Sequence, residues 1–186
     1  MISMFKPKFA VVYGLVITGL VTLNVFSYNN LSPQGTGRIN WMNIEQAEEA
    51  CRKNPRKIVV DVYTDWCGWC KKMDAEAFTD SALAAYINKK FYAVKLNAED
   101  QNNLIFKEKV YRFNASFKAN DLAVLLLNGQ MGYPSFVFLD EKLTPIQSFS
   151  GYQKTADFNF IAHYFGEGAH KKKSLEEYKK DFIPGQ

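Results

Sequence analysis

The 186-residue chain has few of the side chains that build disulfide scaffolds and metal sites, with three cysteines and two histidines. Three cysteines are too few for a fold stapled by disulfides. A zinc site built on a Cys-x-x-Cys pair needs two more cysteine or histidine ligands at suitable spacing, and the chain offers only the isolated Cys51, His163 and His170. The sequence therefore predicts no bound metal and no other cofactor.

The chain also lacks a strong charge imbalance, internal repeats and low-complexity segments. Its formal net charge is +4, and part of this charge lies in Lys171–Lys173 near the C-terminus. Such a balance gives no indication of nucleic-acid binding. In contrast, 47% of the residues are hydrophobic and 15% are aromatic. Because disordered chains are poor in aromatic residues, this composition predicts a globular domain with a substantial core.

The N-terminal region has the pattern of a targeting segment. Lys6 and Lys8 precede residues 9–26, which contain no charged residue. A short basic region followed by an apolar one is typical of an export signal, and a cleavage site ending at Ser27 fits it. The same stretch is long enough to cross a bilayer, so a retained membrane anchor is the alternative. Under both interpretations the rest of the chain crosses the membrane. The sequence therefore predicts an extracytoplasmic, periplasmic protein, either soluble after cleavage or N-terminally anchored.

The remaining chain divides into a linker over 28–40, a domain over 41–166 and a basic C-terminal tail over 167–186. The tail is expected to be solvated and to contain a short helix with a Ser174–Glu177 capping box. Strands are predicted from β-branched and apolar runs at 57–63, 91–96, 136–139 and 146–149. Helices are predicted from periodicity and capping residues between Trp41 and Pro55, where Asn43 can cap with Gln46, after Cys67, after Thr79, and from a Thr155 cap to Gly166. Residues 98–130 are less regular, with a short hairpin at 106–113 and a short buried helix at 121–127. This order predicts an α/β fold with a central mixed sheet flanked by helices.

The chemistry is concentrated in the run Asp65-Trp66-Cys67-Gly68-Trp69-Cys70-Lys71, at the junction of a buried strand and a helix. At the helix N-terminus, unpaired backbone N–H groups and the helix dipole stabilise a Cys67 thiolate. Cys70 lies one turn deeper, where this field is weaker. The asymmetry predicts that Cys67 attacks a substrate disulfide and that Cys70 resolves the mixed disulfide.

Two motifs in this order resemble the thioredoxin-like family. Residues 60–71 (VDVYTDWCGWCK) are similar to the active-site strand and turn of thioredoxins, and residues 132–140 (GYPSFVFLD) are similar to the segment around the cis-proline. The Trp between the cysteines, followed by Lys71-Lys72-Met73, is more similar to exported bacterial thioredoxin-like proteins and to the thioredoxin-like domain of the membrane disulfide reductase. The resemblance implies a thioredoxin fold with an insert, residues 98–130, before the cis-proline strand.

The resemblance also implies roles for single residues. Asp61 matches the buried carboxylate of the family, whose pKa rises on desolvation and which accepts the proton of Cys70. Its alternative is an edge aspartate that points to solvent. Lys95 matches the lysine beside that carboxylate, and its alternative is a solvated strand lysine.

The substrate-docking surface is predicted to comprise Trp66, Gly68, Trp69, Tyr133 and Pro134. A cis Tyr133–Pro134 bond would bring the Tyr133 backbone against the cysteines, where it could pair with an extended substrate. A trans turn proline is the alternative. Trp69 stands where thioredoxin itself has proline, and Tyr133 stands where a smaller residue is usual. Cys51 is interpreted as a buried, inert thiol, and a regulatory or intermolecular disulfide is the alternative.

These features favour a thiol–disulfide oxidoreductase that reduces protein disulfide substrates outside the cytoplasm and is kept reduced by a membrane electron donor. Within the same chemistry, a disulfide oxidase or isomerase is the alternative, and the redox potential distinguishes them. From another class, a non-catalytic binding or chaperone module could use the groove at Tyr133–Pro134.

Overall fold

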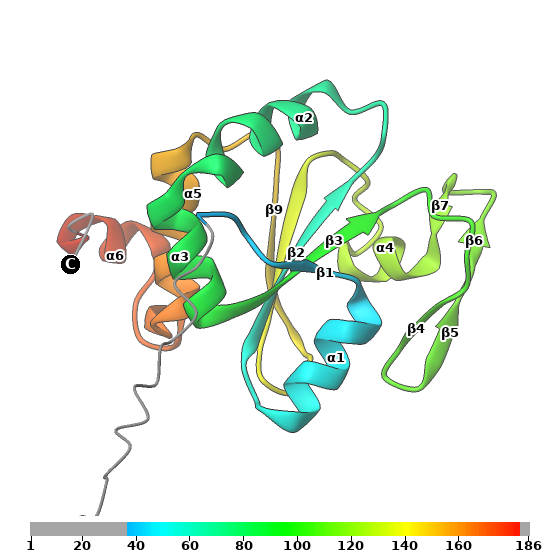
Figure 1. Ribbon diagram of the computed structural model, residues 1–186, viewed down its shortest axis with the longest axis horizontal. Coiled ribbons are helices and arrows are strands. Elements are labelled where there is room, and N and C mark those ends of the chain that lie inside the picture. The colour runs from blue at the N-terminus through cyan, green and yellow to red at the C-terminus, as the bar shows by residue number, and fades with distance from the viewer. Residues whose placement is uncertain (1–36, 183–186) are drawn as a thin grey trace, which may run out of the picture. The chain divides into compact units, whose positions relative to one another are not determined.

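The computed structural model describes residues 37–182 and places them around a five-stranded mixed sheet of order β1-β3-β2-β8-β9 (Figure 1). Strands β1 (Trp41–Met42), β2 (Lys57–Tyr63) and β3 (Phe91–Asn97) run parallel. Strands β8 (Ser135–Leu139) and β9 (Pro145–Ser150) form an antiparallel hairpin that pairs with β2. The predicted α/β thioredoxin fold is therefore confirmed.

The central strand β2 divides the core into two parts, because its successive side chains point to opposite faces of the sheet. Ile58, Val60 and Val62 pack on one face with α1 (Ile44–Lys53) and α4 (Asp121–Leu126). Val59 packs on the other face with α2 (Gly68–Ala75), α3 (Ser81–Lys90) and α5 (Thr155–Gly166). Burial on both faces explains the nearly continuous apolar character of KIVVDVY.

The start of the domain differs from the prediction. Trp41 and Met42 do not begin a helix; they form the short strand β1, which pairs with Ala93 and Val94 of β3. The helix starts at Ile44, and the predicted capping box of Asn43 and Gln46 is confirmed. Ile39, within the stretch interpreted as a linker, is 6% exposed and belongs to the core.

The less regular insert contains two small hairpins rather than one. Strands β4 (Leu104–Phe106) and β5 (Lys109–Tyr111) form the first, close to the expected position, and β6 (Phe113–Asn114) and β7 (Ala119–Asn120) form the second. The predicted short helix is α4, and Asn120 caps it. The backbone N–H of Ile105 donates to the carboxylate of Glu45 on α1, which ties the first hairpin to that helix.

The C-terminal segment packs more closely than a solvated tail. After the short 3-10 helix η2 (Ala169–Lys171), helix α6 (Leu175–Asp181) begins with a Ser174–Glu177 capping box. Tyr178 of α6 stacks on Phe160 of α5, with ring centroids 5.6 Å apart. At the other end of α5, Thr155 is not the cap: it is the first helical residue, and Lys154 holds the cap position without a side-chain bond.

Within residues 37–182, none of the helices is both long enough and apolar enough to cross a bilayer. The predicted targeting segment over 1–27 and the linker residues up to 36 lie outside the described residues.

Candidate redox-active site

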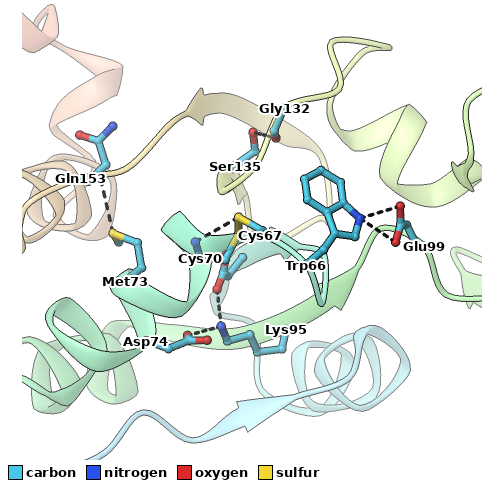
Figure 2. Close-up of a disulfide and its surroundings, with 11 residues drawn as sticks. Trp66, Cys67, Cys70, Met73, Asp74, Lys95, Glu99, Gly132, Ser135 and Gln153 are labelled. Carbon is cyan, nitrogen blue, oxygen red and sulfur yellow. Dashed lines mark hydrogen bonds and ion pairs between the residues drawn. A yellow bond between two sulfur atoms is a disulfide. The ribbon is translucent and has the colours of Figure 1, made fainter.

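The two cysteines of the Cys-x-x-Cys motif are joined by a disulfide where β2 passes into α2 (Figure 2). A tight turn after β2 is closed by the backbone N–H of Cys67, which donates to the carbonyl of Thr64 at 3.1 Å. Cys67 then occupies the N-cap of α2, and its Sγ accepts the backbone N–H of Cys70 at 3.0 Å. The local sequence thus brings the two Cα atoms to 5.3 Å, within the range for a disulfide.

The environment of the two sulfurs is asymmetric. Cys67 lies at the positive end of α2, and the first turn of that helix contains no acidic residue that would oppose a thiolate. Cys70 lies inside the helix and is 2% exposed. After reduction, this arrangement favours negative charge on Cys67.

Asp61 lies on β2 with 2% of its surface exposed, so its side chain points into the protein and not to solvent. Its Oδ2 is 2.6 Å from Nζ of Lys95, which occupies the paired position on β3. Its Oδ1 has no hydrogen-bond partner among the described residues. Burial raises the pKa of Asp61 to about 6, and the nearby Lys95 ammonium only partly opposes this shift.

A second carboxylate, Asp74 on α2, was not identified from the sequence. It pairs with the same Lys95 ammonium and is itself exposed to solvent. The rings of Trp41, Tyr63 and Phe78 surround this ammonium at 5.0 to 5.3 Å. Asp74 is the fourth residue after Cys70 along α2, and this i,i+4 spacing, which places both on one helix face, could have indicated Asp74 from the sequence.

A cavity of about 380 Å³ opens on this pair from the side of β1. Lys95, Asp74, Trp41 and Arg38 are among its lining residues. Lys95 therefore connects the buried Asp61 to a solvent-accessible space, while Asp61 itself has almost no exposure.

Trp66 stands beside the disulfide and is 66% exposed. Its indole N–H donates to both carboxylate oxygens of Glu99 at 3.0 Å, as Figure 2 shows. Its ring packs edge-on against Tyr133, with centroids 5.9 Å apart. Burial and the charge of Glu99 raise the pKa of Tyr133. Glu99, which lies at the start of the insert, is a second residue that sequence reasoning missed.

The segment before β8 lies beside Trp66, because it carries Tyr133. The Tyr133–Pro134 bond is cis, as the resemblance implies. The carbonyl of Pro134 accepts the backbone N–H of Gly151 at 2.7 Å, and Ser135 Oγ donates to the carbonyl of Gly132 at 2.7 Å. Within residues 37–182, the backbone N–H and C=O of Tyr133 have no hydrogen-bond partner.

Two remaining residues of the predicted docking surface belong to α2. Trp69 is 57% exposed. A Cβ built on Gly68 would meet no atom within 4 Å, so the surface above this residue is open. Cys51, in contrast, is buried on α1 on the opposite face of the sheet, and its Sγ lies 3.2 Å from the carbonyl oxygen of Arg56.

The fold and the position of the disulfide define the thioredoxin-like class of proteins. Within this class, residues 27–163 match the family described as Thioredox_DsbH (protein of unknown function, DUF255), and the chain belongs to that family.

A 155-residue stretch is 26% identical to the thiol:disulfide interchange protein DsbD of Vibrio vulnificus and covers 79% of this chain. The chain spans only 23% of the length of that relative.

Two solved structures have a similar fold. A thioredoxin-fold protein from Helicobacter pylori has a TM-score of 0.56 and 15% identity, and the match covers 78% of this chain and 87% of that one. A structure named DsbH oxidoreductase has a TM-score of 0.51 and 16% identity, covering 73% of this chain and 87% of the other.

Proposed function

We propose that the protein is a thiol–disulfide oxidoreductase that reduces disulfide bonds of exported proteins through a Cys67–Cys70 dithiol/disulfide cycle. The observation that carries this proposal is a disulfide at the start of α2 with a buried, ion-paired carboxylate on the adjoining strand. In one cycle the protein dithiol becomes a disulfide, and one substrate disulfide becomes two thiols. Two electrons and two protons pass to the substrate.

The first step is nucleophilic attack. The Cys67 thiolate attacks one sulfur of the substrate disulfide, a mixed disulfide forms, and the other substrate sulfur leaves as a thiolate that takes a proton. The field at the start of α2 supports this step, since it favours the attacking anion over the neutral thiol.

The second step needs a base. Cys70 attacks Cys67, the mixed disulfide breaks, and the second substrate thiol is released. Asp61, with a pKa of about 6, is ionised at neutral pH and is therefore suited to accept the proton that Cys70 loses. Lys95 and the solvent-exposed Asp74 give this proton a route back to solvent.

Docking of the substrate would use the Tyr133 backbone and the exposed rings around the disulfide. An extended segment can pair with a free backbone N–H and C=O as an added strand would. Gly68 follows Cys67 directly, and the open space at its Cα leaves room for such a segment.

The direction of electron flow and the partners are part of the same proposal. The relative from Vibrio vulnificus is named as a thiol:disulfide interchange protein, which supports exchange with other protein thiols. A membrane electron donor would return Cys67 and Cys70 to the dithiol in an extracytoplasmic compartment, to which the sequence of residues 1–27 would direct the chain.

Trapping of substrates tests the proposal. A Cys70→Ser variant cannot resolve, so it should accumulate mixed disulfides through Cys67 that run as high-mass species until a reductant is added. The matched Cys67→Ser variant should accumulate none. If both variants capture the same proteins, the groove acts as a binding module and the proposal is wrong. A measured redox potential well above that of the glutathione couple would instead indicate an oxidase.

A further inference from the structure

A second aromatic pair lies on the side of the disulfide away from Trp66. Trp69, between the two cysteines, packs against Tyr152 with ring centroids 5.3 Å apart. The ammonium of Lys72 lies over both rings, 5.4 Å from the centroid of Trp69 and 5.2 Å from that of Tyr152. The hydroxyl of Tyr152 donates to a carboxylate oxygen of Glu76 at 2.5 Å. Lys72 of α2 and Glu76, the C-cap of that helix, therefore hold Tyr152 against Trp69.

The loop that carries Tyr152 is attached to the rest of the site on both sides. The N–H of Gly151 before it donates to the carbonyl of Pro134, and the N–H of Gln153 after it donates to Met73 Sδ at 3.4 Å. Figure 2 shows Gln153 and Trp66 on opposite sides of the disulfide. Tyr152 is thus fixed on α2 across the disulfide from the Trp66–Tyr133 pair.

Exposure of the two tryptophan rings indicates a surface that is covered by another molecule. Among residues 37–182, Trp66 and Trp69 are the two most exposed large apolar side chains, at 66% and 57%. Exposed apolar groups gathered beside a reactive group mark an interaction site. The occupant must bring a disulfide sulfur to Cys67, and the free backbone groups of Tyr133 suit an extended polypeptide.

We infer, on the basis of the proposed function, that Tyr152 is a specificity-determining residue. With Trp69 it forms one of two aromatic pairs beside the disulfide. These pairs dock an extended polypeptide that carries bulky apolar side chains two residues before and two residues after its disulfide cysteine. In an extended segment, alternate side chains point to the same side. When the cysteine of the substrate faces Cys67, its neighbours two positions away face the same surface, one toward each aromatic pair.

Reduction of designed disulfides by the full chain tests the inference. The substrates are two short peptides, each joined to a second copy by a single central cysteine, with Phe or with Ser two positions on either side of it. Dithiothreitol, present at a concentration that reduces the peptides slowly by itself, returns the protein to its dithiol form. The wild-type protein should show a higher kcat/KM for the Phe peptide than for the Ser peptide, with most of the difference in KM.

The variant Tyr152→Ala should lower this preference ratio by about fivefold, because one aromatic contact with the substrate is lost. Tyr152→Phe keeps the ring and should retain most of the ratio. Phe117→Ala removes an exposed aromatic ring of the insert and serves as the matched control, with the ratio unchanged.

The outcomes separate the inference from the proposed function. If the wild-type protein reduces neither peptide, the proposed function fails. If it reduces both peptides equally, or if Tyr152→Ala keeps the full preference for Phe, the oxidoreductase proposal stands and the role of Tyr152 is wrong. If Tyr152→Phe loses as much preference as Tyr152→Ala, the effect follows from the bond to Glu76 and the ring contact is likewise excluded.

Discussion

Nζ of Lys95 lies 2.6 Å from Oδ2 of Asp61, and the two side chains come from directly paired positions of the parallel strands β3 and β2. The pair does not compensate fully for burial, because Oδ1 of the carboxylate has no partner among the described residues. The pKa of Asp61 is accordingly raised from 3.8 to about 6. Such a group lowers the stability of the fold at neutral pH, and a pKa near 6 is what the proposed base requires.

The first prediction concerns this loss of stability. Since the pKa of Asp61 is raised in the folded state, the folded protein binds the proton more tightly than the unfolded chain does, and stability falls as the pH rises from about 4 to 6. Asp61→Asn removes this contribution. The free energy of unfolding of the oxidised variant, minus that of the wild type, should therefore grow by roughly 2 kcal/mol between pH 4 and pH 7.

Urea unfolding of both proteins at several pH values measures this difference. Comparison of the two proteins cancels the carboxylates with lowered pKa, such as Glu141, which stabilise the fold at higher pH in both. A difference that stays constant with pH would show that Asp61 titrates normally.

The second prediction concerns the resolving step. The rate at which Cys70 breaks the mixed disulfide should rise with pH around 6, as Asp61 becomes ionised and able to accept the proton. In Asp61→Asn this rise should disappear, and the rate at pH 7 should fall by about 100-fold. Rapid acid quenching of a single turnover measures the lifetime of the mixed disulfide. Equal lifetimes and equal pH profiles for variant and wild type would exclude Asp61 as the base.

The third prediction concerns Asp74. Its negative charge raises the pKa of Asp61, and it also shares the ammonium of Lys95. Asp74→Asn should therefore lower the pKa of Asp61 and move the pH dependence of both earlier measurements to lower pH. Asp157→Asn, an exposed change of the same charge on α5, is the control and should leave the profiles in place. A profile for Asp74→Asn that coincides with the control would mean that solvent screens this charge.

Much of the sheet and the redox pair could be predicted from the sequence, because their signals are local. The apolar run of β2, the helix opening at Cys67 and the hairpin of β8 and β9 each follow from residues next to one another. The position of Asp61 needed the resemblance as well, since an aspartate within an apolar strand can also lie at an edge.

The missed features depend on contacts between distant parts of the chain. Strand β1 has only two residues, too few for a periodic pattern, and it exists because β3 offers an open edge. The bond between Trp66 and Glu99 spans 33 residues, and the one between Tyr152 and Glu76 spans 76. Neither spacing has a local signature, so these partners became visible only in three dimensions.

The last prediction concerns the insert, where the sequence was least informative. Asn120 is completely buried, and its side chain forms hydrogen bonds with three backbone groups of this region. Its Nδ2 donates to the carbonyls of Asp100 at 3.3 Å and Asn102 at 3.1 Å, and its Oδ1 accepts the N–H of Leu122 at 3.0 Å. Asn120→Ala leaves these groups without partners and removes the cap of α4, so it should lower the free energy of unfolding by about 2 to 3 kcal/mol.

Asn120→Asp separates the two effects, because aspartate keeps the capping oxygen and loses the amide donor. It should cost at least as much as Asn120→Ala, because the oxygen that replaces Nδ2 lies against the carbonyl oxygens of Asp100 and Asn102 in a buried site, while the cap of α4 is kept. Urea unfolding gives the stabilities, and amide hydrogen exchange shows where the structure opens. The amides of the hairpin of β4 and β5 should exchange faster in both variants. The exchange rate of β2 should change only as much as the global free energy of unfolding changes. Unchanged exchange in that hairpin would mean that its bonds to α1, such as the one from Ile105 to Glu45, hold it without Asn120.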